Sequence, residues 1–206
     1  MTEGIRILFT RFTMVSAHLS IIPEFLEKIK LLGYTKIFNI NKAEVLNTAN
    51  NSEILFRGIK TSAGNQTASL KSLQGISTWI LDEAEELIDE NIFDTIDLSI
   101  REKGVQNRII LVLNPVTKEH WIYERFFLDR GVEAGFNGIK DNVCYIHSTY
   151  KDNKENLSNS FLQRIKTIKE RNIKKYKHAI LGGWLDAAEG VVFDNWSIGE
   201  FNPDNL

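Results

Sequence analysis

Two adjacent carboxylates are the residues of this sequence best suited to chemistry. Asp82 and Glu83 directly follow residues 78–81 (TWIL), an apolar run typical of a buried strand. Hydrolysis of a nucleoside triphosphate needs one carboxylate for the Mg²⁺ that bridges the phosphates and a second for the attacking water. Their order suits Asp82 to the metal and Glu83 to the water. Both side chains can face one ligand because the chain turns where the strand ends.

The same residues have a structural interpretation without chemistry. Asp82 begins the run DEAEEL, which reads as the acidic first turn of a helix. Carboxylates are favourable there because they interact with the positive end of the helix dipole. From the residues alone, both interpretations of Asp82 and Glu83 stay open.

A second polar residue follows another apolar run. Asn114 comes directly after residues 108–113 (RIILVL), about one β-α-β unit beyond the carboxylates. An asparagine at such a strand end can hydrogen-bond the attacking water or a γ-phosphate oxygen. The alternative is a simple turn, since Asn114-Pro115 is a dipeptide that favours turn initiation.

The sequence lacks the glycine-rich loop that holds phosphates. Gly-Lys-Ser and Gly-Lys-Thr are absent from all 206 residues, although a phosphate-binding loop requires one of them between a strand and a helix. Residues 58–61 (GIKT) come near this pattern, but an isoleucine separates the glycine from the lysine. We therefore expect any phosphate-binding loop to precede Met1.

The pattern of apolar residues predicts an α/β fold with a mostly parallel sheet flanked by helices. Residues 77–81 and 108–113 are continuously apolar and predict strands covered on both faces, in the middle of the sheet. Residues 36–60 contain short β-prone pieces between Asn-rich turns and predict a small antiparallel insertion. The remaining predicted elements are strands at 5–10 and 143–147 and helices at 16–33, 92–100, 120–128 and 158–181.

Composition limits the class of protein. The formal net charge is −2, from 25 basic and 27 acidic residues, so any contact with nucleic acid must come from a local patch. The single cysteine, Cys144, excludes an internal disulfide, and no apolar run is long enough to span a bilayer. These features predict a cytoplasmic protein that does not enter membranes.

Four stretches of the sequence resemble the large terminase subunits of tailed phages, the ATP-driven motors that package DNA. They are ILFTRFTM, FRGIKTSAGNQTASLKSLQGISTWILDEAEEL, LVLNPVTKEHWIYERFF and YKHAILGGWLDAAEGVVF. The resemblance implies a P-loop NTPase fold in which Asp82 belongs to the Walker B motif and binds Mg²⁺, and Glu83 is catalytic. It also implies that Asn114 couples hydrolysis to motion. Lys71 is the nearest match to the family's arginine finger, but a lysine lacks the bidentate fork of arginine.

The resemblance further implies cofactors, partners and domain boundaries. The cofactors would be ATP and Mg²⁺, and the partners double-stranded DNA, the portal protein and the small terminase subunit. The full-length protein would form a homo-oligomeric ring in the cytoplasm of a bacterial host. Residues 1–182 would form a partial ATPase domain, truncated before its Walker A loop. Residues 183–206 would form a linker toward a missing nuclease domain.

Other functions compete with this hypothesis. The chain could be a non-enzymatic prophage remnant or interaction module that retains the fold, or part of another P-loop motor such as a helicase. The basic residues of 164–177 could contact DNA phosphates, although a lysine-rich helix face is more often simply solvated. The aromatic residues of 121–127 favour core packing over base stacking.

Overall fold

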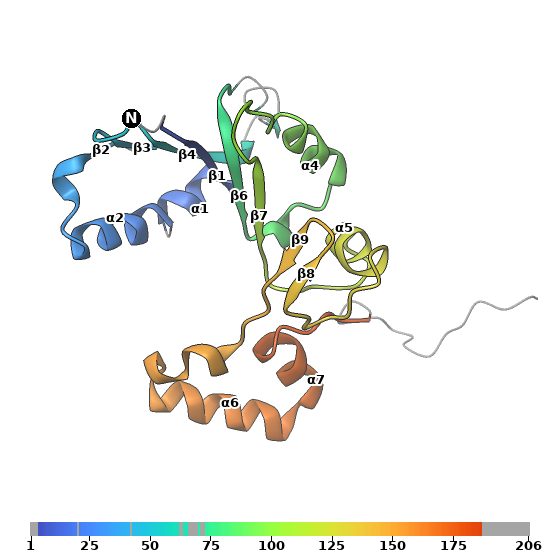
Figure 1. Cartoon of the computed structure of the whole chain (residues 1–206). Helices are drawn as coiled ribbons and strands as arrows, with labels where there is room; N and C mark the ends of the chain where they lie inside the picture. Colours follow the sequence, from blue (N-terminus) through green and yellow to red (C-terminus); the bar gives the residue numbers. More distant parts are fainter. Residues whose placement is uncertain are drawn as a thin grey trace, which may run out of the picture. The chain divides into compact units, whose positions relative to one another are not determined.

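In the computed structural model, which describes residues 4–19, 21–41, 43–61, 64–65, 70 and 73–186, the chain forms two units. They comprise residues 1–114 and residues 115–206 (Figure 1). Residues 187–206, most of the predicted linker, lie outside the described part. The boundary expected at residue 182 therefore stays a prediction.

The first unit is built around one sheet. Its strands are β1 (Arg6–Thr13), β2 (Phe38–Ile40), β3 (Glu44–Asn47), β4 (Glu53–Thr61), β5 (Gly64–Asn65), β6 (Ile76–Asp82) and β7 (Arg108–Val112). Its helices are α1 (Met14–Leu19), α2 (Ile21–Leu31) and α4 (Glu90–Asp97), with short 3₁₀ turns η1 (Thr35–Ile37) and η2 (Ala84–Glu86).

The sheet is mostly parallel, as the sequence predicts. The strand order is β2-β3-β4-β1-β6-β7, with β5 paired to β4. Strand β1 is parallel to both β4 and β6, and β6 is parallel to β7. The antiparallel part consists of the pairings of β2 with β3, β3 with β4 and β4 with β5. Strand β4 thus belongs to the central sheet as well as to the region from which an insertion was expected.

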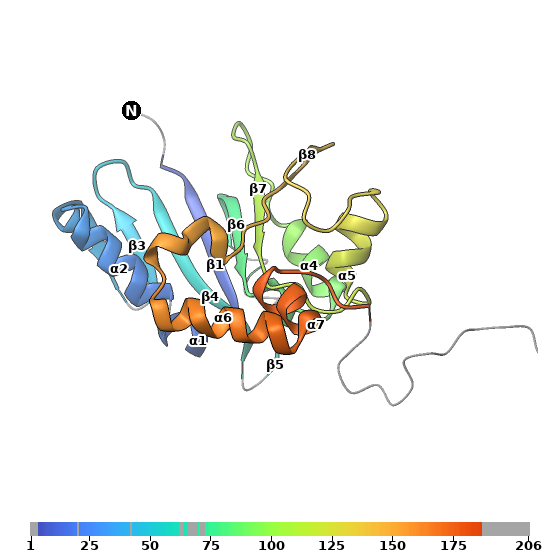
Figure 2. The ribbon, with the colours of Figure 1, turned by 90° about the horizontal axis from the view of Figure 1, so that it is seen from below.

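Helices cover opposite faces of this sheet. Ile22 and Ile29 of α2 pack against Val45 and Phe56, and the ring of Phe25 meets Phe56 edge-on at 6.2 Å. Helix α4 lies on the other face, where the ring of Phe93 is 5.3 Å from that of Trp79. The strand register explains the separation, because Phe56 and Trp79 are one residue out of step across β1 and so point to opposite faces. The two helices lie beside different strands of the sheet (Figures 1 and 2).

Strand β7 differs from the prediction. The apolar run at 108–113 was expected in the middle of the sheet, yet β7 is the last strand in the described order, and its residues alternate in burial. Ile110 is 42% exposed and Val112 49% exposed. An apolar run reveals β propensity and burial potential, but the number of neighbouring strands depends on distant segments.

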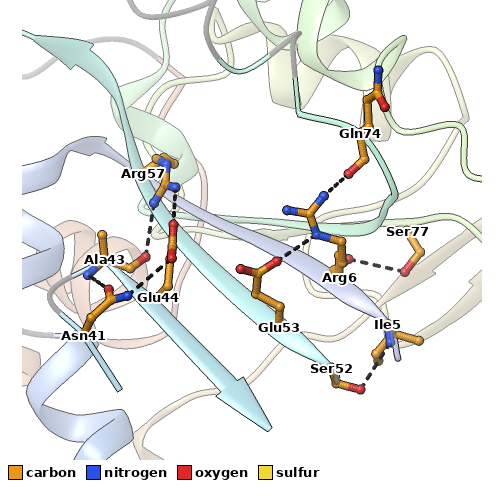
Figure 3. A network of polar contacts seen from close by, with 10 residues as sticks. All are labelled: Ile5, Arg6, Asn41, Ala43, Glu44, Ser52, Glu53, Arg57, Gln74 and Ser77. Atoms are coloured by element: carbon orange, nitrogen blue, oxygen red, sulfur yellow. Dashed lines mark hydrogen bonds and ion pairs between the residues drawn. The ribbon is translucent and has the colours of Figure 1, made fainter. Parts of the chain in front are cut away.

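Two polar networks join neighbouring strands away from the carboxyl ends of β1 and β6 (Figure 3). In the first, Arg6 Nε donates to Glu53 Oε2 at 2.8 Å and the Arg6 guanidinium also donates to the carbonyl of Gln74. In the second, Arg57 Nη2 donates to Glu44 Oε1 at 2.8 Å. Each arginine pairs with one carboxylate on a neighbouring strand, which stabilises the register.

The second unit contains short elements. Its strands β8 (Gly138–Lys140) and β9 (Val143–Tyr145) form an antiparallel pair. Its helical segments are α5 (Trp121–Tyr123), η3 (Glu124–Leu128), η4 (Tyr150–Asn156), α6 (Asn159–Arg171), α7 (Ile173–Lys175) and η5 (Tyr176–Ile180).

The long helix expected at 158–181 is interrupted. Asn172 has φ −148° and ψ 91°, and its side chain accepts a hydrogen bond from the backbone N–H of Lys175 at 2.9 Å. Asparagine competes with helical hydrogen bonding in this way, so it ends α6 and caps α7. The periodicity of the flanking residues does not reveal this break.

The aromatic residues of the second unit pack together, as expected. The ring of Phe127 lies 5.4 Å from that of Tyr145 and 5.6 Å from that of Trp184. Trp121 is buried and its ring lies 6.3 Å from that of Phe126. These contacts assign the aromatic cluster to the core of this unit.

Candidate active site

The candidate site lies at the carboxyl end of β6. The strand is buried along most of its length, and Trp79 and Leu81 are fully enclosed. Asp82 is its last residue. The carboxyl ends of parallel strands are where ligands bind in open α/β sheets. The sequence therefore placed Asp82 correctly at a strand end.

Glu83 has an unusual backbone conformation. Its φ of 53° and ψ of 50° lie in the left-handed region, which costs a non-glycine residue about 1–2 kcal/mol. Along a regular strand Glu83 would point away from Asp82. The left-handed turn breaks that alternation and brings both carboxylates to one side. The turn expected at this strand end is thus present in the backbone.

Arg11 of β1 binds both carboxylates. Its Nε donates to Asp82 Oδ2 at 2.7 Å, and its Nη2 lies 2.6 Å from Glu83 Oε1. The exposed fractions of the three side chains are 12% for Arg11, 14% for Asp82 and 33% for Glu83. The strand register accounts for this contact, because the pairing of Thr10 with Leu81 puts Arg11 beside Asp82.

Sequence reasoning did not single out Arg11. The only signal was that Arg11, like Arg6, lies inside the β-prone run of residues 5–13, where an unpaired charge would be costly. Its partners lie about 70 residues later, so no local spacing connects them.

Asn114 lies at the same edge of the sheet. It contacts Glu85 and not the Asp82–Glu83 pair among the described contacts. Its Nδ2 donates to Glu85 Oε1 at 3.1 Å, which connects the end of β7 to η2. The amide is therefore positioned by the segment that follows the two carboxylates. The role proposed for Asn114 in the reaction stays a prediction.

Negative charge is concentrated around η2. Partial removal of solvent raises the pKa of the Glu86 carboxyl, and the nearby charges of Glu83 and Glu85 raise it further. Arg11 acts in the opposite direction and lowers the pKa of Glu86. Among the described residues, the carboxylates of this site outnumber the guanidinium of Arg11, an environment that favours a cation.

The structural alternative for Asp82 finds little support in the geometry. Asp82 belongs to the strand, and the helical segment that follows it, η2, is only three residues long. The dipole of so short a segment is small, since the macrodipole is a sum over aligned peptide units.

Residues 58–61, the near match to a phosphate-binding loop, are part of strand β4. Lys71, the candidate finger residue, lies outside the described residues.

The donor set suits Mg²⁺ in part. Within the described segments, no group of three or more His, Cys, Asp or Glu side chains is arranged to hold a metal ion. However, Asp82 and Glu83 already converge on a single cation, the Arg11 guanidinium. Mg²⁺ in sites that act on phosphates typically uses one or two carboxylates and completes its shell with water and phosphate oxygens. The residues present therefore fit a Mg²⁺–nucleotide complex.

The basic stretch of the second unit is solvent-exposed. Its seven members all have exposed side chains: Arg164, Lys166, Lys169, Arg171, Lys174, Lys175 and Lys177. The ammonium group of Lys169 also lies 5.6 Å from the ring centre of Tyr176. Contact of this stretch with DNA stays a prediction. In the part of the chain that the structure describes, no helix has the length and hydropathy needed to cross a bilayer.

The family of the chain follows from comparison with known proteins. A family model described as phage terminase large subunit matches residues 1–183, so the chain belongs to this family. The large terminase subunit of Bacillus phage SPP1 is 27% identical over 199 residues, which cover 88% of this chain and 42% of that protein. The chain thus spans less than half the length of this relative.

Solved structures share the fold. The large terminase of a thermophilic bacteriophage, solved in complex with ADP, matches with a TM-score of 0.63 and 16% identity over 90% of this chain and 42% of that chain. The large terminase ATPase domain of Thermus phage P74-26 matches with a TM-score of 0.57 and 14% identity, over 89% of this chain and 78% of that chain. The fold is therefore the α/β fold of terminase ATPase domains, as expected from the sequence.

Proposed function

We propose that this chain is the ATP-hydrolysing part of a terminase large subunit, whose activity drives packaging of double-stranded DNA into the capsid. The observation that carries the proposal is the pair Asp82 and Glu83, brought together at a strand end by a left-handed residue. Family membership supports it, as does the ADP bound by a terminase of the same fold. The phosphate-binding loop would come from outside these 206 residues.

Each residue has a distinct role in this proposal. Asp82 would hold Mg²⁺, which neutralises the charge of the phosphates when bound. Glu83 accepts a proton from the attacking water, as a general base at the end of the Walker B strand. Asn114 connects the edge of the sheet to η2 through Glu85, so a change at the γ-phosphate could move this segment.

The proposed partners follow from the family. Double-stranded DNA, the portal protein and the small terminase subunit would assemble with the full-length protein, which would form a homo-oligomeric ring in the bacterial cytoplasm. A basic residue at Lys71 would act on the nucleotide of a neighbouring subunit. These assignments rest on family membership.

The decisive test replaces Glu83 and Asp82 in a longer form of the protein that carries a phosphate-binding loop. Glu83→Gln should leave nucleotide binding nearly intact and slow hydrolysis by about a hundredfold or more, the scale for loss of a general base. Asp82→Asn should instead weaken Mg²⁺-dependent nucleotide binding. Steady-state turnover per folded molecule and nucleotide affinity separate the two effects.

Glu86→Gln provides the matched control, because Glu86 belongs to the same acidic run, but among the described residues it interacts with Arg11 only through charge and not through a salt bridge. Its turnover should stay near that of the wild type. Wild-type turnover in Glu83→Gln would contradict the catalytic assignment. A wild-type protein that binds ATP without hydrolysing it would instead favour the non-enzymatic alternative.

A further inference from the structure

Arg11 has a different environment from the other paired arginines of the sheet. Arg6 and Arg57 each pair with one glutamate on a neighbouring strand (Figure 3). Arg11 instead contacts two consecutive carboxylates with two different nitrogens, at 2.7 and 2.6 Å. It also has the smallest exposed fraction of the three, 12% against 36% for Arg6 and 27% for Arg57.

The position of Arg11 is fixed by its own strand. Strand β1 is paired on both sides, with Arg11 opposite Gly58 of β4 and Thr10 opposite Leu81 of β6. Gly58 permits the close approach of the β1–α1 junction, since a Cβ there would lie 2.5 Å from the backbone nitrogen of Met14. The guanidinium is therefore held at the carboxylates by rigid elements and not by a loop.

The carboxylates that Arg11 contacts are those assigned to metal and water in the proposed function. A guanidinium and a divalent cation that share one carboxylate pair repel each other, and the low exposure of Arg11 and Asp82 limits the solvent that would screen this repulsion. Conversely, without a metal the two adjacent negative charges would repel each other if Arg11 were absent.

We propose that Arg11 is the resident counter-cation of the Asp82–Glu83 pair, and that Mg²⁺ competes with its guanidinium for these carboxylates. Arg11 is thus a positioning residue that holds the pair together before metal binds and sets how tightly metal binds. This inference rests on the proposed function in one respect, that Asp82 is a metal ligand.

The proposal is tested by Mn²⁺ binding, a probe for the Mg²⁺ site, using the 206-residue chain and electron paramagnetic resonance to measure free Mn²⁺. Arg11→Met keeps much of the side-chain stem and removes the charge, so it should bind Mn²⁺ at least about tenfold more tightly than the wild type. Arg11→Lys keeps the charge but cannot contact both carboxylates in a fork. Its Mn²⁺ affinity should lie between those of the wild type and Arg11→Met. Arg6→Met removes an arginine of the same strand that pairs with the single carboxylate of Glu53, away from Asp82 and Glu83, and should leave the Mn²⁺ affinity unchanged.

A double variant tests whether the tighter Mn²⁺ binding of Arg11→Met involves Asp82. In Arg11→Met with Asp82→Asn, the increase in Mn²⁺ affinity should disappear. Equal or weaker Mn²⁺ binding by Arg11→Met, or no measurable binding by either protein, would overturn the proposal. The ATPase test of Glu83 is separate, so failure of one does not imply failure of the other.

Thermal unfolding separates the proposal from a purely structural role. Arg11→Met should unfold at a lower temperature than the wild type without metal, because two carboxylates lose their partner. Added Mn²⁺ should then raise its melting temperature by more than it raises that of the wild type, since a ligand that binds only the folded state stabilises it more as its affinity increases. A lower melting temperature with the same response to Mn²⁺ in both proteins would show a structural role only.

Discussion

At the scale of single residues, charge balance is the main property of the site. Glu83 maintains a costly left-handed backbone, and such a conformation persists only where the surroundings impose it. In this conformation the Glu83 carboxylate forms an ion pair with Arg11. The strained residue and the paired charge therefore coincide at Glu83.

Glu86 provides a pH-dependent test of this electrostatic environment. Desolvation first, and the neighbouring carboxylates second, raise the pKa of Glu86 in the folded chain. A raised pKa means that the protonated form is favoured by folding, so this contribution is present below about pH 4 and lost as pH rises through the folded value. We expect Glu86→Gln to be more stable than the wild type at pH 7 and equal to it near pH 4. Urea unfolding across this range measures the difference.

Glu44 is the matched control with the opposite sign. The hydrogen bond from Arg57 lowers the pKa of Glu44, so ionised Glu44 favours folding at neutral pH, and the contribution is lost as pH falls. Glu44→Gln should therefore be less stable than the wild type at pH 7, with a gap that narrows toward acid. If both substitutions changed the free energy of unfolding at pH 7 in the same direction, the opposite pKa shifts given for Glu86 and Glu44 would be wrong.

At the scale of elements, the pairing of β1 with β6 positions the site. Their buried interface contains a polar contact, in which Trp79 Nε1 donates to Thr10 Oγ1 at 2.8 Å, with both residues fully buried. This bond lies one residue from Arg11 and three from Asp82. It requires one particular register, because a shift by one residue would point Thr10 to the other face.

Thr10→Val tests the importance of this contact. The substitution nearly preserves shape but leaves the Trp79 N–H without its acceptor, which should lower the free energy of unfolding by about 1–3 kcal/mol. Thr10→Ser keeps the hydroxyl and should cost only about 0.8 kcal/mol, the value of one buried methylene-sized group. Urea unfolding of the two variants compares them directly, and wild-type stability in Thr10→Val would show that the bond contributes little.

At the scale of the whole molecule, the chain corresponds to part of a longer relative. It belongs to the terminase large subunits but spans 42% of the length of the SPP1 protein. In the proposed function its described residues would supply the carboxylates of Asp82 and Glu83, while the glycine-rich pattern that binds phosphates is absent from its sequence. The contribution of the carboxylates to nucleotide binding can therefore be measured separately from that of a phosphate-binding loop.

The 206-residue chain alone should bind ATP weakly and hydrolyse it no faster than background. The backbone N–H groups and lysine of a phosphate-binding loop supply most of the affinity for the phosphates, and the 206-residue sequence lacks the pattern of such a loop. Isothermal titration calorimetry with Mg²⁺–ATP measures the affinity, and a longer form with the loop is the control. A dissociation constant below about 1 μM for the short chain would mean that the phosphate site lies elsewhere.

Much of the fold and part of the site could be predicted from local patterns. The apolar run before Asp82 was sufficient to predict a buried strand ending in two carboxylates, because burial and strand propensity are properties of neighbouring residues. The acidic pair, Asn114 and the mostly parallel sheet follow from the same kind of reasoning. Family resemblance identified the class of protein from motifs that are continuous in sequence.

Tertiary structure decided the features that depend on distant contacts. Arg11 meets Asp82 and Glu83 only because β1 and β6, about 70 residues apart, pair in one register. The exposure of β7 likewise depends on which strands lie beside it. The break at Asn172 depends on a side-chain hydrogen bond that competes with helical hydrogen bonding. Periodicity records which residues can be buried or helical. The partner that neutralises a charge or covers a strand is determined by chain topology, through contacts that local sequence does not encode.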